Sequence, residues 1–225
     1  MKTRALKYLL LFFLSGVHVI IIAQQKDFSG LLGVSATHNL DRSWDVSLAA
    51  QTLFNQNINE LWIASADVGA GYQLNSNWKM EVHYRPIRFR NLDNNYESRN
   101  LFYHTLTYTK GAGKFSFSIR NRMQQLVYGD HFNDNFKGPR WYNRDKFTVK
   151  YRLDYYWSVS VAAESFLPLN NPARDKLDQL RTGVGIERTI NDRMRIDGYY
   201  TIQQQLNRKG NDTGYLAALN LYYKF

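Results

Sequence analysis

The last twelve residues, 214–225, read Gly-Tyr-Leu-Ala-Ala-Leu-Asn-Leu-Tyr-Tyr-Lys-Phe. In an extended chain, alternate side chains point to opposite faces. One face of this stretch collects only apolar and aromatic residues: Tyr215, Ala217, Leu219, Leu221, Tyr223 and Phe225. The apolar residues do not recur three and four positions apart, as an amphipathic helix requires. The C-terminal stretch therefore predicts a β-strand with one apolar face.

The same alternation recurs along the chain from Phe28 onward. It predicts eleven strands, over residues 28–38, 44–54, 61–73, 78–90, 99–110, 114–128, 145–153, 157–166, 177–189, 194–206 and 214–225. No long segment of helical period interrupts them, so residues 24–225 are expected to form one all-β unit.

The predicted connections alternate in length. Short turns rich in Asn, Asp, Gly and Ser fall at 39–43, 75–77, 111–113, 154–156 and 190–193. The connections between them are mostly longer, at 55–60, 91–98, 129–144, 167–176 and 207–213. Short turns at one end and longer loops at the other are typical of a transmembrane antiparallel β-barrel. A soluble, lipocalin-like ligand-binding barrel would show the same period, with its apolar face turned inward.

Large aromatic residues favour the membrane alternative. A large aromatic often stands on the apolar face just after a short turn, and Phe225 lies at the same level: the predicted girdle is Trp44, Trp78, Phe115, Trp157 and Phe225. A row of aromatic rings at one height suits a membrane interface. The Tyr223 and Phe225 pair also resembles the C-terminal signal by which the barrel-assembly machinery recognises outer-membrane barrels. Outer-membrane lipid and that machinery are therefore the expected partners.

The opposite face carries charge in mid-strand, and it would line the interior of the barrel, the lumen. The predicted lumen network is Asp45, Asp67, Lys79, Glu81, His83, Arg85, Arg120, Arg122, Lys150, Arg152, Glu164, Arg181, Glu187, Arg195 and Asp197. Eight basic residues stand against six acidic ones. This near-balance predicts cross-strand ion pairs that fill a narrow interior. The alternative is a mildly cationic pore that prefers small anionic solutes, with Arg120 and Arg122 as its strongest basic pair.

The N-terminus indicates export. Lys2, Arg4 and Lys7 precede a short apolar run over 8–22, and the small residue Ala23 follows it, so residues 1–23 are expected to be a cleaved signal peptide. Without them, 26 Lys and Arg stand against 19 Asp and Glu, a net charge of +7. These charges are dispersed, with no basic run that would indicate nucleic acid. The mean hydropathy of −0.49 averages two faces and excludes only helical spans. We expect residence in the outer membrane of a Gram-negative bacterium.

The mature chain resembles the DUF2490 family of uncharacterised, Bacteroidetes-type outer-membrane barrel proteins. The resemblance rests on diffuse motifs spread over residues 27–225: 44–48, 71–72 before Trp78, 83–85 with Arg88, 98–103, 114–116 with Arg120 and Arg122, and 222–225. It implies an outer-membrane barrel and brings no activity. At Pro86 the apolar residues change register toward Ile87 and Phe89, which predicts a β-bulge.

Candidates for catalysis are few. A lipid acyl hydrolase needs a serine beside a histidine, and only His83 points to the polar face in mid-strand. A barrel protease would need Asp and His near the loop rim, where Asp130 and His131 stand. The absence of Cys excludes disulfides, thiolate metal sites and a lipid-anchor cysteine. No catalytic residue, metal or cofactor is predicted, and enzymes of either type remain alternatives.

Two features stay open in the sequence. Bacterial single-chain barrels have even strand counts, so eleven segments predict 10 to 12 strands, with 28–38 threading the lumen, lying at the rim or pairing as an extra strand. The aromatic-rich loop 130–144 would either cap the barrel mouth or contact a ligand. The favoured interpretation is a non-enzymatic narrow channel, or a structural or binding barrel, with an ion-paired lumen.

Overall fold

The computed structural model describes residues 28–91, 93–128, 139–170, 176–207 and 212–225. They form eleven strands: β1 (Phe28–Asn39), β2 (Trp44–Asn55), β3 (Glu60–Gln73), β4 (Trp78–Arg90), β5 (Tyr96–Ala112), β6 (Phe115–Tyr128), β7 (Arg140–Arg152), β8 (Trp157–Pro168), β9 (Gln179–Thr189), β10 (Met194–Gln205) and β11 (Thr213–Lys224). No helix in these ranges is long and apolar enough to cross a membrane. The expected signal peptide, 1–23, lies outside the described residues.

All eleven predicted strands are present, and the main differences lie at two strand starts. Strand β5 begins at Tyr96 rather than 99, and β7 begins at Arg140 rather than 145. The predicted loop 130–144 is therefore wrong over 140–144, where the aromatic pair Trp141 and Tyr142 belongs to a strand. Bulky aromatic residues fit a pleated, half-buried surface as well as they fit a loop. Residues 130–138 lie outside the described part of the chain.

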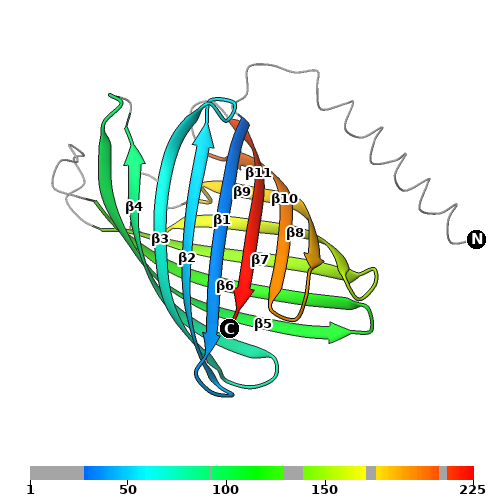
Figure 1. The fold of residues 1–225 in the computed structure, drawn as a ribbon. Helices are drawn as coiled ribbons and strands as arrows, with labels where there is room; N and C mark the ends of the chain where they lie inside the picture. The colour runs from blue at the N-terminus through cyan, green and yellow to red at the C-terminus, as the bar shows by residue number, and fades with distance from the viewer. Residues whose placement is uncertain (1–27, 92, 129–138, 171–175, 208–211) are drawn as a thin grey trace, which may run out of the picture.

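The sheet closes on itself through its two terminal strands. Each strand pairs antiparallel with its sequence neighbour, and β1 also pairs parallel with β11, from Phe28 opposite Tyr215 to Thr37 opposite Lys224 (Figure 1). Eleven strands lie within the predicted 10 to 12, although the count is odd. Segment 28–38 is the eleventh strand of the wall, which leaves no sheet edge unpaired. In lipid each unpaired backbone group would cost several kcal/mol, on the order of a lost hydrogen bond.

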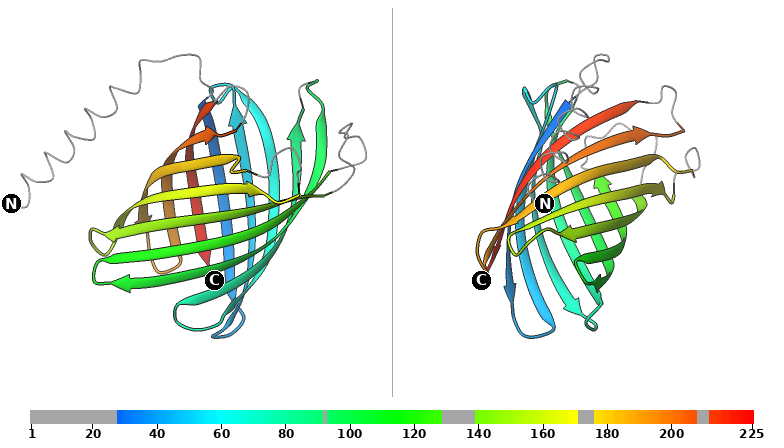
Figure 2. Two further views of the ribbon diagram at one scale, coloured as in Figure 1. Left: turned by 180° about the vertical axis from the view of Figure 1, so that it is seen from behind. Right: turned by 90° about the vertical axis from the view of Figure 1, so that its right-hand side faces the viewer.

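The two faces of the wall have opposite chemistry. Outward side chains are apolar and exposed, including Leu48 at 61%, Val82 at 55% and Ile119 at 54%. Inward residues include Asp67 at 5% and Glu164 at 7% exposure. The tilted strands form a closed wall around the interior (Figure 2). An apolar exterior around a charged lumen is the arrangement of a transmembrane barrel and the reverse of a lipocalin-like one.

Pro86 keeps the strand in register, so the predicted bulge is wrong. Pairing of β4 with β5 runs without a shift from Trp78 opposite Tyr108 to Arg90 opposite Tyr96. Exposure also alternates through Pro86 and Arg88, which point outward, while Ile87 points inward. The shift in hydrophobicity reflects a change in what each face contacts, with apolar residues entering the lumen. The irregularity occurs instead between Leu53 and Phe54 of β2, opposite β3.

Four of the five short turns share one structure. An Asx side chain accepts hydrogen bonds from the backbone N–H groups two and three residues on, at Asp41, Asn75, Asp154 and Asn191. Donation from Trp44 and then Ser43 lowers the pKa of Asp41 from its ordinary 3.8. The fifth turn, between β5 and β6, depends on Gly113, whose φ of 62° favours glycine. Each Asx turn fixes the large side chain that starts the following strand.

The parallel closure can be tested by cross-linking. Ala36 of β1 and Tyr223 of β11 are direct register partners on the outer face. The chain has no native cysteine, so Ala36→Cys with Tyr223→Cys is expected to form a disulfide in the folded barrel, seen as a mobility shift reversed by reductant. The control pair Ala36→Cys with Tyr222→Cys places the thiols on opposite faces. Equal cross-linking of both pairs, or of neither, would contradict this register.

Candidate functional site

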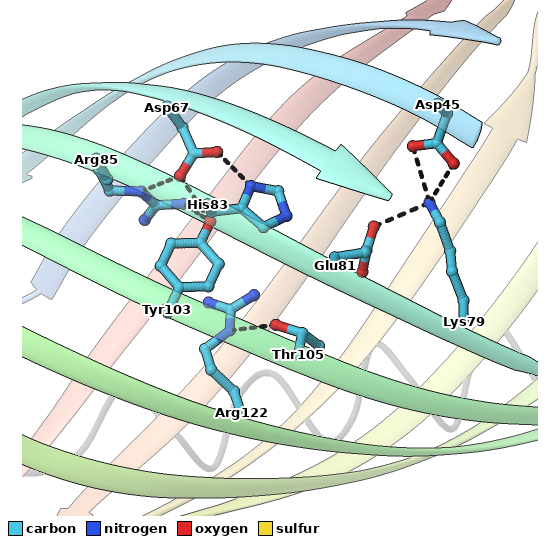
Figure 3. Close-up of polar contacts among 9 residues, drawn as sticks. All are labelled: Asp45, Asp67, Lys79, Glu81, His83, Arg85, Tyr103, Thr105 and Arg122. Carbon is cyan, nitrogen blue, oxygen red and sulfur yellow. Dashed lines mark hydrogen bonds and ion pairs between the residues drawn. The ribbon is translucent and has the colours of Figure 1, made fainter. Parts of the chain in front are cut away.

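The lumen side of β3, β4 and β5 carries a group of side chains around Asp67. His83 Nδ1 lies 2.7 Å from Asp67 Oδ1, and Arg85 Nε donates to Asp67 Oδ2 at 2.8 Å. The Tyr103 hydroxyl donates to the same oxygen at 2.6 Å, and the Tyr103 ring stacks on His83 with centroids 4.6 Å apart. Figure 3 shows the three partners converging on the one carboxylate. Asp67 of β3 thus contacts three side chains from the two following strands, β4 and β5.

Gly69 makes room for this group. It is the register partner of His83, and a Cβ at Gly69 would overlap the His83 ring. The ring is held by Asp67 and Tyr103 and cannot easily move aside. A glycine on the lumen face therefore allows a histidine to lie flat against the wall.

A second group lies nearer the short turns. Lys79 Nζ is 2.9 Å from Asp45 Oδ2 and 2.9 Å from Glu81 Oε1, so one ammonium bridges two carboxylates (Figure 3).

Arg122 of β6 lies beside the Asp67 group. It donates to the Thr105 hydroxyl at 3.2 Å, and its guanidinium carbon lies 4.1 Å from the Tyr103 ring centroid. This side of the lumen therefore holds several acidic residues in contact with cations.

The opposite wall, β6 to β9, is mainly basic. Glu164 Oε1 of β8 accepts hydrogen bonds from the guanidinium groups of Arg120 at 2.7 Å and Arg144 at 3.0 Å. Lys146 and Arg181 are its register partners on β7 and β9. Four cations thus surround one buried carboxylate.

Two further groups complete the network on β7 to β11. Glu187 accepts Lys150 at 3.0 Å, Arg195 at 3.2 Å and the Ser158 hydroxyl at 3.3 Å. Asp197 accepts Asn220 at 2.9 Å and Tyr222 at 3.2 Å. Arg152, the remaining residue of the predicted network, lies exposed at the end of β7.

The lumen contains a cavity of about 490 Å³. Its lining holds seven basic residues, Arg85, Arg120, Arg122, Arg144, Lys146, Lys150 and Arg181, and three acidic ones, Glu164, Glu187 and Asp197. The near-balance predicted from the sequence concerns the whole lumen, and the lining of this cavity is more basic than that. Asp45 and Glu81 contact Lys79 outside the cavity, whereas Asp67 pairs with Arg85 of the lining. The cavity keeps an excess of positive charge even when Asp67 is counted against Arg85.

The cavity adjoins a second hollow of about 310 Å³ at the short-turn end, lined by Arg152, Asp154 and Tyr156 among others. Lys150, Ser158 and Glu187 line both spaces. The Lys150–Glu187 ion pair therefore lies at the boundary between the cavity and the short-turn end.

The predicted girdle residues all lie at the short-turn end of the barrel. Trp44, Trp78, Phe115 and Trp157 are each the first residue of a strand, and Phe225 follows the end of β11. Trp44 packs on Tyr72 and Trp78 on Tyr108, with ring centroids 4.7 Å and 4.9 Å apart. The Tyr223 and Phe225 rings of the expected insertion signal contact each other edge to face at 4.8 Å.

Several lumen residues are absent from the sequence prediction. Arg144 falls in the predicted loop 130–144, and Lys146 lies outside the predicted network although it alternates with Phe147. Tyr103 and Asn220 also lie inside, where each binds an Asp carboxylate. Uncharged residues give no charge signal in the sequence, but their alternation with the outward residues Phe102 and Leu219 places them on the lumen face.

Among the described residues, His83 is the histidine that lies on the lumen face of a strand. His83 is oriented by Asp67, yet among the described residues no serine hydroxyl is hydrogen-bonded to it. Asp130 and His131 lie outside the described part of the chain. Within the described ranges, no group of three or more His, Asp or Glu side chains could hold a metal ion.

The fold and the lumen define a class: a closed β-barrel with an apolar outer wall and a charged interior. A solved structure titled "NanC porin" is similar, with a TM-score of 0.54 at 12% identity over 89% of this chain and 100% of that one. A "bacterial polysaccharide outer membrane secretin" is similar at a TM-score of 0.52 and 11% identity, over 82% of this chain and 64% of that one. At these identities the likeness concerns the fold alone.

The family follows from the sequence itself. The family model "Protein of unknown function (DUF2490)" matches residues 28–214. The chain therefore belongs to the DUF2490 family, as the motifs predicted. No curated protein matches the sequence.

Proposed function

We propose that this protein is a narrow outer-membrane channel that favours small anionic solutes. The observation that carries the proposal is the lumen cavity, where seven basic side chains face three acidic ones. Rings of Arg and Lys give a pore anion preference, because a fixed positive charge lowers the energy of an anion in a narrow, water-poor space. The outer wall of apolar residues and the aromatic row at the short-turn end support membrane residence. The outer membrane is the proposed location, and its lipid and assembly machinery are the proposed partners.

Bilayer electrophysiology tests the proposal. Purified barrel in a planar bilayer under a KCl gradient is expected to give stepwise conductance, with a reversal potential shifted toward that of chloride. The double variant Arg144→Gln with Lys146→Gln removes two cavity charges and is expected to reduce the chloride preference. The control is Lys110→Gln with Lys114→Gln, which also removes two charges, from exposed residues at the end of β5 and in the turn after it, outside the cavity. A sealed bilayer at every protein dose would refute the channel, and a potassium preference would refute the anion selectivity.

A further inference from the structure

The cavity charge is concentrated on one part of the wall, which we call the basic cluster. Its members are Arg120 and Arg122 of β6, Arg144 and Lys146 of β7, Arg181 of β9, and the single acid Glu164 of β8. Five cations and one carboxylate leave four positive charges uncompensated within four adjacent strands.

The pairing of the strands places like charges directly opposite each other. Arg120 is the register partner of Lys146, and Arg122 is the register partner of Arg144. Like charges in this arrangement repel and destabilise a sheet. Ordinary structural ion pairing would bring an acid into contact with each base, as Asp45 and Glu81 both contact Lys79. The cluster instead places positive side chains next to each other. This repulsion lowers the stability of the sheet, and it is the expected cost of a site that binds an anion.

One aromatic ring, that of Phe166, contacts two guanidinium groups of the cluster. The guanidinium carbons of Arg144 and Arg181 lie 4.2 Å and 4.3 Å from the Phe166 ring centroid. Phe166 is itself buried. Arginine stacked on a buried ring loses little further freedom when it binds a ligand, so these groups are preorganised.

The cluster also holds donors that no acceptor satisfies. The Nε atoms of Arg120, Arg144 and Arg181 are buried and have no hydrogen-bond partner among the described residues. Both guanidinium contacts to Glu164 use the same oxygen, Oε1. A buried unsatisfied donor costs free energy, and an acceptor that enters the cavity would recover it.

We propose that the basic cluster is a binding site for a small organic anion that carries carboxylate or phosphate groups and at least two negative charges. Carboxylate and phosphate oxygens match the donor fork of a guanidinium. The cavity volume of about 490 Å³ lies in the range of pockets that hold small organic ligands. The inference rests on the proposed channel only for the route by which the solute reaches the site. Glu164 limits the net charge, so that a bound solute can leave again.

Calorimetric titration of the purified full-length barrel tests the site directly. The probes are citrate, inorganic phosphate, acetate and uncharged glucose. Citrate and phosphate are expected to bind saturably, acetate about tenfold or more weakly, since one charge–charge contact is worth roughly that factor, and glucose not at all. Carboxylate and phosphate ligands are separated by which of the first two probes binds more tightly.

Three variants are expected to shift the citrate affinity in opposite directions. Arg144→Gln and Arg181→Gln are each expected to weaken citrate binding about tenfold, because each removes a charged donor. Glu164→Gln is expected to strengthen it by a similar factor, since it removes the competing carboxylate. Lys79→Gln makes the same charge change as the arginine variants at a lumen site that does not line the cavity, and is expected to leave the affinity within about twofold. Heat-modifiable migration on gels confirms that each variant is folded.

The opposite shifts keep the proposal falsifiable even where one arginine variant fails to fold. Absence of saturable citrate and phosphate binding would overturn it, and so would a Glu164→Gln variant that folds and binds more weakly. Anion-selective conductance without such binding would leave the channel standing and remove the site. Saturable citrate or phosphate binding without any conductance in a bilayer would support the site and refute the channel.

Discussion

An Asp67→Ala barrel is expected to lose about 3–5 kcal/mol of unfolding free energy, because one substitution leaves several buried groups without their acceptor. Asp67 is the acceptor for Arg85 at 2.8 Å and Tyr103 at 2.6 Å, and it lies 2.7 Å from the His83 ring. Without it, the Arg85 guanidinium keeps its charge in the lumen wall with no carboxylate beside it. Removal of one partner of a buried ion pair costs more than the pair contributes, since the remaining charge stays desolvated.

Urea titration of barrels folded into phospholipid vesicles would measure this loss. Asp45→Ala is the matched control, because Lys79 retains Glu81 at 2.9 Å when Asp45 is removed. Its loss is expected to be about 1 kcal/mol, within the usual worth of a partly exposed pair. The Asp67 group would not be the central support of β3 to β5 if both variants unfolded at the same urea concentration.

A Leu48→Arg substitution is expected to destabilise the membrane-folded barrel by about 2–4 kcal/mol, the cost of a cation on the lipid face near mid-bilayer. Leu48 is 61% exposed and lies five residues into β2 counting Trp44, on the same face as that aromatic. In water an exposed leucine could be replaced by arginine at little cost. The penalty therefore arises only if lipid covers this face.

Leu40→Arg is the matched control for this test. Leu40 is 60% exposed and belongs to the short turn between β1 and β2, outside the strands. The chemical change and the exposure are nearly identical, so the two variants differ only in their position relative to the membrane. Refolding into vesicles, followed by tryptophan fluorescence in urea, measures both. Equal tolerance of the two arginines would place β2 in water and contradict a transmembrane barrel.

Three of the short turns share a sequence motif that the strand analysis alone does not identify. The short turns read Leu-Asp-Arg-Ser-Trp from Leu40, Leu-Asn-Ser-Asn-Trp from Leu74 and Leu-Asp-Tyr-Tyr-Trp from Leu153. In each, the leucine N–H donates to the carbonyl of the tryptophan four residues on. The aromatic row was predicted, whereas the Asx residue that positions each ring three residues later was not. A local motif of this kind could be found from sequence alone because all its bonds are short-range.

The basic cluster could not be found in the same way. Arg120 and Glu164 are 44 residues apart and meet at 2.7 Å. Their contact depends on the register of β6 with β7 and of β7 with β8. A shift of one residue in either pairing would turn one side chain to the lipid face and separate the pair. Counting charges along the strands thus gave a near-balance, while the registers gather five cations around one acid.

The sequence by itself determined the class of protein. The period of two, the apolar and charged faces and the alternating turn lengths are properties of each strand and its neighbours, and they define a barrel with lipid outside and charge inside. Only the tertiary structure decided how the barrel closes and where its charge gathers. Both β1 and β11 run toward the short-turn end, so closure is parallel and the strand count is odd. Closure and clustering depend on hydrogen-bond registers between strands far apart in the chain, and no local pattern encodes them.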